Sequence, residues 1–144
     1  MQMKVRIEIC ENQEEDIIIL AKEMTDTVKK IQELLVPVTE IIGYKGDEFK
    51  KLEKGEIYAV FVETGKVYAL TEKDKWQVKL RLYQLEDALS GDFVKINQSC
   101  LVSVGKIEKF RASLGGALSV ILKNGYTDYI SRRQLKEVKE RMSF

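Results

Sequence analysis

The sequence predicts a mostly β fold with short helices, preceded by an N-terminal strand and one long amphipathic helix. Apolar residues recur at helical spacing as far as Pro37, and from about residue 41 they gather into short runs of strand length. The chain has 144 residues, 44% of them hydrophobic, which is enough for one ordinary core. We therefore expect an N-terminal extension over residues 1–40 and a β domain over residues 41–144.

The extension is predicted to contain a strand and a helix. Residues 3–9 alternate apolar and charged side chains, which is the period of a half-buried strand. Asn12 and Glu15 can form a capping box and Pro37 ends the pattern, so a helix is predicted over about residues 13–35. One apolar stripe runs along this helix: Ile17, Ala21, Met24, Val28, Ile31 and Leu35. The stripe is either a short coiled-coil seam joining two copies of the chain or a face packed on the strand or the β domain.

The β domain is predicted to consist of short strands, tight turns and two short helices. Strands are expected over residues 57–63, 66–71, 76–80, 93–96, 100–104, 107–112, 117–123 and 126–130. Thr64–Gly65 joins the first two strands, and Asn124–Gly125 has the composition of a type I′ hairpin turn. Helices are expected over residues 82–89, ending at Gly91, and over 131–142, with Ser131 as N-cap.

The composition argues against an enzyme and against a bound cofactor. The chain has no histidine, so neither a Ser-His-Asp nor a Cys-His arrangement can form. Two cysteines without histidine do not make a zinc site, and we expect Cys100 to be a packed thiol. No Gly-rich phosphate loop opens a helix, and no small-molecule substrate is expected. With no apolar run of about 18 residues and no signal peptide, a cytoplasmic location is expected.

Charge is distributed unevenly along the chain. Residues 1–44 hold 5 Lys or Arg against 9 Asp or Glu, whereas residues 91–144 hold 10 against 5. A basic region at one end of a compact domain suits a polyphosphate partner, because phosphate neutralisation releases counterions. An excess of five charges is by itself common among proteins that bind no nucleic acid.

Three polar residues, Asn97, Gln98 and Ser99, separate the apolar runs F-V-K-I and C-L-V-S. They are either an ordinary loop or a set of hydrogen-bonding side chains displayed between two strands. Asn and Gln can form paired hydrogen bonds with adenine, and Arg with guanine, whereas Lys and Ser suit phosphates.

The stretches L-Y-Q-L-E-D-A-L, F-V-K-I-N-Q-S-C-L-V-S-V-G-K-I and L-K-N-G-Y-T-D-Y-I-S-R-R-Q-L-K-E-V-K occur in this order. Together they resemble the LytTR DNA-binding domain of bacterial transcription regulators, over about residues 41–144. The resemblance implies antiparallel sheets that bind double-stranded DNA through loops. Those loops enter successive major grooves at direct repeats near promoters, without a recognition helix.

The same resemblance implies a set of DNA-binding residues. Base contacts are expected from Asn97, Gln98 and Arg133, and backbone contacts from Lys66, Lys95, Ser99 and Arg132. Asn97 and Gln98 stand where the family commonly has His and Arg, so the target sequence is expected to differ.

The extension resembles that of small stand-alone regulators of the family that lack a receiver domain. About 40 residues are too few for a doubly wound receiver domain. Such regulators are often encoded beside a restraining membrane protein, which implies either homodimerisation or docking to that partner through the extension. The alternative function is a protein–protein interaction module that binds no DNA.

Overall fold

The computed structural model describes residues 4–12, 17–35 and 38–144. Contacts between residues divide the chain into two units, Met1–Leu35 and Val36–Phe144. The name β domain is used below for the second unit.

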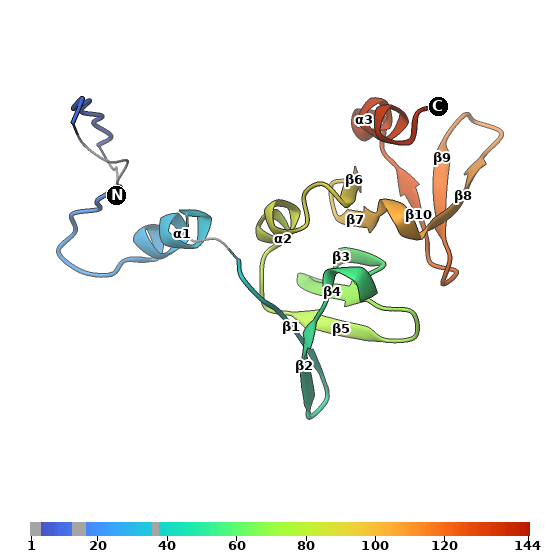
Figure 1. The fold of residues 1–144 in the computed structure, drawn as a ribbon, viewed down its shortest axis with the longest axis horizontal. Coiled ribbons are helices and arrows are strands. Elements are labelled where there is room, and N and C mark those ends of the chain that lie inside the picture. The colour runs from blue at the N-terminus through green and yellow to red at the C-terminus, as the bar shows by residue number, and fades with distance from the viewer. Residues whose placement is uncertain (1–3, 13–16, 36–37) are drawn as a thin grey trace. The chain divides into compact units, whose positions relative to one another are not determined.

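The β domain contains two antiparallel sheets (Figure 1). The strand order is β2-β1-β5-β4-β3-β7-β6 in the seven-stranded sheet and β10-β9-β8 in the three-stranded sheet. The bounds are β1 (Ile41–Lys45), β2 (Glu48–Leu52), β3 (Ala59–Glu63), β4 (Lys66–Leu70), β5 (Lys75–Val78), β6 (Phe93–Asn97), β7 (Cys100–Ser103), β8 (Ile107–Ala112), β9 (Leu118–Leu122) and β10 (Thr127–Ile130), with the 3-10 turns η1 (Lys54–Glu56) and η2 (Val104–Lys106). The predicted strands are confirmed with slightly different bounds, whereas β1 and β2 were not identified individually.

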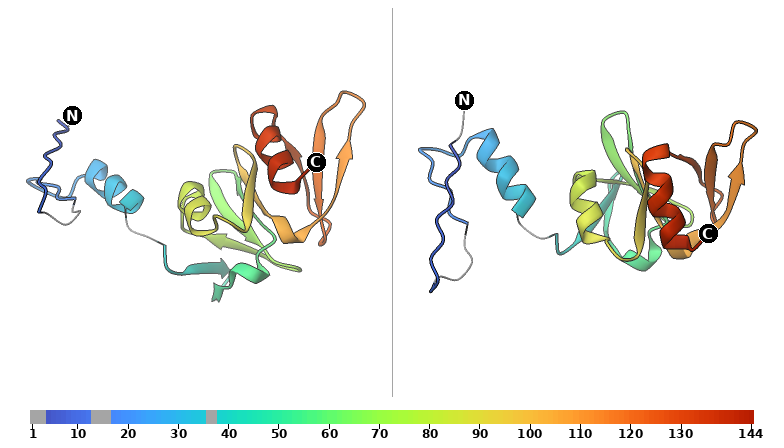
Figure 2. Two further views of the ribbon diagram at one scale, coloured as in Figure 1. Left: turned by 45° about the horizontal axis from the view of Figure 1, so that its top comes forward. Right: turned by 90° about the horizontal axis from the view of Figure 1, so that it is seen from above.

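The seven-stranded sheet is covered on both faces, so the domain has two cores (Figures 1 and 2). The short helix α2 (Leu82–Ala88) covers one face, where its Leu85 packs with Val60 and Leu101. The three-stranded sheet and α3 (Arg132–Met142) cover the other face, where Val138 of α3 belongs to the second core. The β domain is thus built from three layers.

Strand β7 shows why some strands of this sheet appear in the sequence as continuous apolar runs. All four of its residues are buried. Leu101 lies in the first core, whereas Cys100 and Val102 lie in the second. Because alternate side chains enter different cores, a strand buried on both faces shows no polar alternation.

The two predicted hairpin turns have different geometries. Thr64 and Gly65 both have positive φ, 49° and 76°, as a type I′ turn requires. In the Asn124–Gly125 turn only Gly125 has positive φ, 91°, and Gly125 N donates to Leu122 O over 2.9 Å. The predicted type I′ turn is therefore wrong at this position, where Lys123 and Asn124 precede a single left-handed glycine. Asn124 is held in this conformation because its Nδ2 donates to Thr71 O and its Oδ1 accepts from Tyr126 N.

Both predicted helices of the β domain are confirmed. Ser131 caps α3, because its Oγ accepts from Gln134 N over 3.3 Å. The sequence predicted Gly91 as the C-cap of α2, but the C-cap is Leu89, and Gly91, with φ 98°, lies two residues further on.

The N-terminal unit contains a helix much shorter than predicted. Helix α1 is Asp26–Leu35, and residues 17–25 are not helical; residues 13–16 lie outside the described part. Thr25 begins the helix, since its Oγ1 accepts from Val28 N over 3.2 Å. The three consecutive isoleucines over residues 17–19 add to this outcome, because β-branched side chains lower helix propensity.

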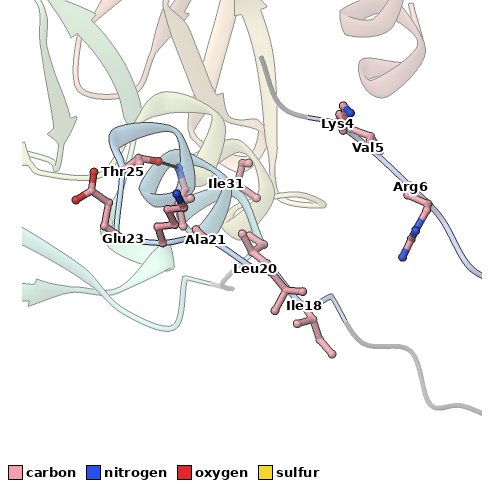
Figure 3. A pocket seen from close by; sticks show the side chains of 12 residues that line it. Lys4, Val5, Arg6, Ile18, Leu20, Ala21, Glu23, Thr25 and Ile31 are labelled. Atoms are coloured by element: carbon pink, nitrogen blue, oxygen red, sulfur yellow. Dashed lines mark hydrogen bonds between the residues drawn. The ribbon is translucent and has the colours of Figure 1, made fainter. Parts of the chain in front are cut away.

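The predicted strand over residues 3–9 is also wrong for residues 4–9, which pair with no other described segment. Val5, Ile7 and Ile9 are 86%, 83% and 91% exposed, so their alternation reflects no half-buried sheet face. Within this unit, Val5 and the side chains of Ile18, Leu20 and Ile31 line a hollow of about 570 Å³ (Figure 3).

Candidate nucleic-acid interface

The turns that follow β3 and β6 lie at the same end of the seven-stranded sheet. Strand β3 pairs with both β4 and β7, and Val62 N donates to Ser99 O over 2.9 Å beyond the last β3–β7 register pair. The β3–β4 turn, which precedes Lys66, therefore projects beside the β6–β7 turn at Gln98 and Ser99.

The start of α3 joins the same end. Ser131 N donates to Ile96 O over 2.8 Å, and Asn97 Nδ2 donates to Tyr129 O over 2.9 Å. These two bonds connect the end of β10 to the end of β6, immediately before the β6–β7 turn. We call the three loops, Thr64–Lys66, Gln98–Ser99 and Ser131–Arg133, the site end.

Asn97 is not displayed to solvent as expected but lies inside the domain. It is the last residue of β6 and is 2% exposed. Its Nδ2 also reaches Asp128 Oδ1 at 3.3 Å, and its Oδ1 accepts from Ser99 N at 2.9 Å. A β-bulge between Lys95 and Asn97 turns the side chain toward β10. Asn97 thus holds the β6–β7 turn against β10 and the start of α3.

Two further side chains complete this buried cluster. Tyr126 donates its hydroxyl proton to Asp128 Oδ2 over 2.9 Å, and its oxygen lies 3.9 Å from Cys100 Sγ. Burial raises the pKa of the Cys100 thiol and that of the Tyr126 hydroxyl, and Asp128 adds to both shifts. Both groups stay protonated at neutral pH, and the prediction that Cys100 is a packed thiol is confirmed.

The other side chains of the site end are exposed. Lys66, Gln98, Ser99, Arg132 and Arg133 all face solvent. In the part of the chain that the structure describes, no ion pair or side-chain hydrogen bond engages the two arginines, Lys66 or Gln98. Arg132 and Arg133 are also the first two residues of α3, where the helix dipole disfavours positive charge. An anionic partner would relieve both this repulsion and the lack of counter-charge.

Lys95 is separated from these residues. It lies one residue pair before the bulge, opposite Leu101, whose side chain belongs to the α2 side of the sheet. Its Nζ lies 3.8 Å from Glu86 Oε2 of α2, and its side chain is 27% exposed. The structure therefore does not bring Lys95 together with the arginines.

Sequence reasoning did not assign Asp128 or Tyr129. Strand β10 directs Asp128 and Ile130 inward and leaves Tyr129 58% exposed, two residues before Ser131. The available signal was the alternation in Y-T-D-Y-I, which places a carboxylate on the inner face of a strand. An inward carboxylate without a histidine or lysine partner indicates a buried hydrogen-bond acceptor.

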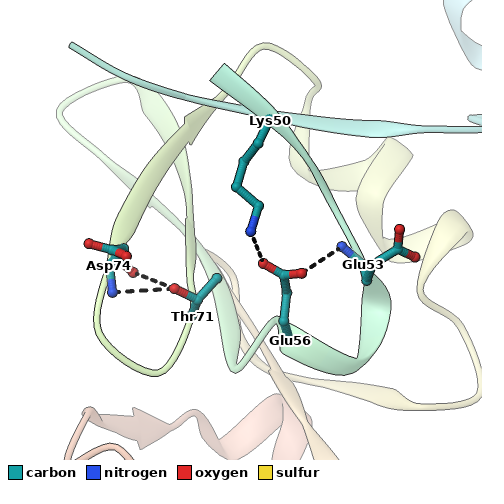
Figure 4. Close-up of polar contacts among 5 residues, drawn as sticks. All are labelled: Lys50, Glu53, Glu56, Thr71 and Asp74. Carbon is teal, nitrogen blue, oxygen red and sulfur yellow. Dashed lines mark hydrogen bonds and ion pairs between the residues drawn. The ribbon is translucent and has the colours of Figure 1, made fainter. Parts of the chain in front are cut away.

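The opposite end of the β domain carries the β4–β5 turn, η1 and the β9–β10 loop, and two of its lysines, Lys45 and Lys50, have carboxylate partners (Figure 4). Lys50 Nζ donates to Glu56 Oε1 over 2.8 Å, and Glu53 N donates to Glu56 Oε2 over 3.3 Å. Lys45 Nζ lies 2.6 Å from Asp74 Oδ1. The hydrogen bond from Lys50 lowers the pKa of Glu56, and the bond to Asp74 raises the pKa of Lys45.

The described residues contain neither a metal-binding cluster nor a membrane-spanning helix. They contain no group of three or more His, Cys, Asp or Glu side chains placed to hold a metal ion. Over residues 4–12, 17–35 and 38–144, no helix is long and apolar enough to cross a membrane.

Comparison with known proteins gives consistent results. The family described as LytTr DNA-binding domain matches residues 47–143. Uncharacterized HTH-type transcriptional regulators of Staphylococcus aureus, from strains COL and MW2, are 33% and 32% identical to the chain over 145 residues, covering 98% of it and 99% of each relative. A solved LytTr DNA-binding domain from Bacillus cereus, of a protein described as a methyl-accepting/DNA response regulator, has a TM-score of 0.67 at 17% identity. The match covers 73% of this chain and 97% of the Bacillus cereus chain, and it shows that the two share a fold.

Proposed function

Because the chain belongs to the LytTR DNA-binding domain family, we propose that it is a bacterial transcriptional regulator whose site end reads DNA sequence. Three loops from separate parts of the sequence converge there, and none of the described residues supplies a carboxylate partner for their cations. That convergence is the observation that carries the proposal. Strands separate α1, α2 and α3 from one another in the described chain, so these helices form no helix-turn-helix pair, and we expect loops to enter the grooves.

The exposed side chains divide into base-reading and backbone-binding groups. Gln98 can pair with the N6 and N7 edge of adenine, and Arg133 with O6 and N7 of guanine, at about 1–3 kcal/mol of discrimination each. Ser99, Arg132 and Lys66 suit phosphates and would set the register of the protein on the duplex. Asn97 contributes by holding Gln98 and Ser99 in place, since its own polar atoms are engaged within the protein.

The start of α3 supplies backbone donors as well. Ser131 Oγ engages Gln134 N, which leaves the N–H groups of Arg132 and Arg133 pointing out of the helix start. A phosphate placed there would accept hydrogen bonds from these N–H groups and would lie at the positive end of the helix dipole. The same phosphate would offset the repulsion between the dipole and the two guanidinium groups.

Lys95 has a conditional role. Its contact with Glu86 at 3.8 Å is long and partly exposed, so it contributes little to stability. We assign Lys95 to the DNA backbone only if it exchanges Glu86 for a phosphate on binding.

The regulator would act in the cytoplasm on direct repeats near promoters, with one β domain on each repeat. Two copies in tandem would place their loops in successive major grooves on one side of the duplex. Because Gln98 replaces the Arg that relatives commonly carry, the preferred repeat would include an adenine at the position read by this turn.

Binding of the full chain to promoter-region duplex DNA across a range of salt concentrations tests the proposal. We expect sequence-selective binding whose affinity falls steeply with salt, and Gln98→Ala should relax preference at one base pair. Lys73→Ala is the matched control, because Lys73 is exposed in the β4–β5 turn at the opposite end. Binding that is weak at low salt or indifferent to sequence would contradict the proposal and favour a protein-interaction module.

For the N-terminal unit we propose homodimerisation. Ile17, Ile18, Leu20 and Met24 are 70%, 77%, 91% and 62% exposed, and together with the hollow of Figure 3 they form an apolar surface without a described cover. A second copy would bury these side chains and would bring two β domains to tandem repeats. The alternative is that a membrane protein that restrains the regulator binds this apolar surface.

The oligomeric states of the full chain and of residues 36–144, measured by sedimentation, test whether a second copy covers this surface. Dimers of the full chain and monomers of the truncated chain would support the proposal. Monomers of both would contradict homodimerisation and leave two alternatives, packing within the chain and binding to the membrane partner.

A further inference from the structure

A fourth loop projects from the same end of the β domain as the three loops of the site end. Strands β8 and β9 form a hairpin whose tip covers residues 113–117. Leu118 pairs with Ala112 on one side and with Ile130 on the other. The tip therefore projects from the three-stranded sheet at the end where β10 leads into Ser131–Arg133 (Figure 2).

The tip is narrow and apolar. Ser113 N donates to Ala117 O over 2.8 Å and Gly116 N to Ser113 O over 3.0 Å, which closes the loop. A Cβ added to Gly115 or Gly116 would meet no atom within 4 Å, and Gly116 needs its φ of 82°. Leu114 is 110% exposed and is the only large side chain in the tip. An apolar side chain held this far into solvent is most easily explained by a partner surface.

The hairpin that carries this tip has a basic outer face. Phe110 of β8 faces α3, with its ring centroid 4.9 Å from that of Phe144. Its neighbours on either side, Lys109 and Arg111, are exposed, and no ion pair or hydrogen bond is found for their side chains among the described residues. Both cations therefore lie on β8, the strand that leads to Leu114.

We propose that this hairpin is an additional DNA contact, which inserts Leu114 into the minor groove beside the segment read by the site end. The proposal rests on the proposed DNA-binding function. The minor groove is about 6 Å wide, so it admits a tip whose other residues are glycine, alanine and serine. Lys109 and Arg111 would contact the phosphates that border the groove, and Leu114 would pack against sugars and base edges as apolar wedges do in minor-groove binding proteins.

Charge and position favour DNA over a protein partner for this hairpin. The tip lies at the end that already carries Arg132 and Arg133, and its strand adds two further free cations. A protein partner at the same place would have to share that surface with DNA.

The experiment uses the full chain and a duplex that it selects from a random library of about four helical turns, roughly 40 base pairs. Affinity and hydroxyl-radical footprints, which report minor-groove access, are measured for the wild type, Leu114→Ala, Arg111→Ala and Gln98→Ala. Phe49→Ala is the matched control for Leu114, because Phe49 is 72% exposed on β2, away from the site end. Lys73→Ala is the matched control for Arg111.

Leu114→Ala is expected to weaken binding about 3- to 10-fold and to remove protection at one flank of the footprint, while preference within the repeat is kept. Arg111→Ala should weaken binding to a similar extent and lower the salt slope by about 1. Phe49→Ala and Lys73→Ala should match the wild type.

Unchanged affinity and footprint in Leu114→Ala and Arg111→Ala, with weakened binding in Gln98→Ala, would overturn the hairpin contact alone. If the wild type selects no duplex, the proposed function and this inference both fall. Because Leu114 is fully exposed, its replacement does not threaten folding, and a thermal melt of each variant checks this.

Discussion

The two ends of the β domain differ in whether their cationic side chains have carboxylate partners. At the opposite end Lys45 and Lys50 each have a carboxylate partner, at 2.6 Å and 2.8 Å. At the site end Lys66, Arg132 and Arg133 have none among the described residues. Unpaired cations that lie close together repel each other, so an external anion at the site end would relieve this repulsion.

Each end is anchored by one asparagine that links the two sheets, Asn97 through β10 and Asn124 from the β9–β10 loop. At the site end Asn97 bonds Tyr129 O, Asp128 Oδ1 and Ser99 N. At the opposite end Asn124 bonds Thr71 O and Tyr126 N. Asn97 is buried and Asn124 is half-buried, so the stronger anchor lies beneath the loops that are proposed to read DNA. A binding surface made of loops needs such support, because its geometry cannot come from a rigid helix.

The largest expected effect distinguishes these two anchors. Asn97→Ala should lower the free energy of unfolding by about 2–3 kcal/mol, because it removes the hydrogen bonds to Tyr129 O, Asp128 Oδ1 and Ser99 N and leaves a gap where a buried side chain stood. Asn124→Ala should cost about 1 kcal/mol, since water can reach its partners. Urea denaturation of the full chain measures both. Equal losses would show that the two ends are anchored alike.

Asn97 also shows where sequence reasoning reached its limit. The order of elements around it, strand, turn, strand, was predictable from the apolar runs on either side. Its burial was not, because it depends on Asp128 and Tyr129, about thirty residues away in the sequence and brought near by the packing of one sheet on another. A polar residue between two strands is predicted to be a turn unless a distant acceptor is known.

The second prediction compares one cation from each end. Arg133→Ala should weaken binding to a selected duplex about 10- to 100-fold, the value of one bidentate arginine–guanine pair, and should relax preference at one base pair. Lys73→Ala should leave binding unchanged. Fluorescence anisotropy at one fixed salt concentration measures both, and thermal melts should show both variants folded. A similar loss in the two variants would mean that general charge, not the site end, attracts DNA.

The third prediction separates the two neighbouring arginines. Arg132→Ala should weaken binding to all duplexes by a similar factor and reduce the slope of log affinity against log salt by about 1, as expected for one lost phosphate contact. Unlike Arg133→Ala, it should leave base preference unchanged. If Arg132→Ala alters preference instead, the roles assigned to the two side chains are exchanged.

Errors in the predicted fold fall where local signals compete or are weak. The helix over residues 13–35 was too long because an apolar stripe cannot reveal that Thr25 will cap a shorter helix. Strand β2 has the sequence E-F-K-K-L and is exposed at four of its five positions, so it gave no apolar pattern. The Asn124–Gly125 turn was located correctly, but its type was set by the bond from Asn124 to Thr71 O, which is a tertiary contact.

The smallest expected effect concerns the opposite end of the β domain, where Lys50 is paired with Glu56. The hydrogen bond from Lys50 lowers the pKa of Glu56 in the folded chain. A carboxyl group with a lowered folded pKa stabilises the protein above its unfolded pKa, about 4.3, and this stabilisation is lost as the pH falls through the folded pKa. Glu56→Gln should therefore cost up to about 0.5 kcal/mol at pH 7, given that the pair is partly exposed. The difference from the wild type should shrink toward zero as the pH falls below about 4.

A variant of the site end, Arg133→Ala, is the comparison for the stability of Glu56→Gln. Arg133→Ala removes no internal ion pair from the described structure, so its free energy of unfolding should equal that of the wild type at both pH values. Urea denaturation of the three proteins at pH 7 and near pH 3.5 tests this, within the acidic range where carboxyl groups titrate. A pH-dependent difference for Arg133→Ala would reveal a carboxylate partner at the site end and would remove the charge contrast between the two ends.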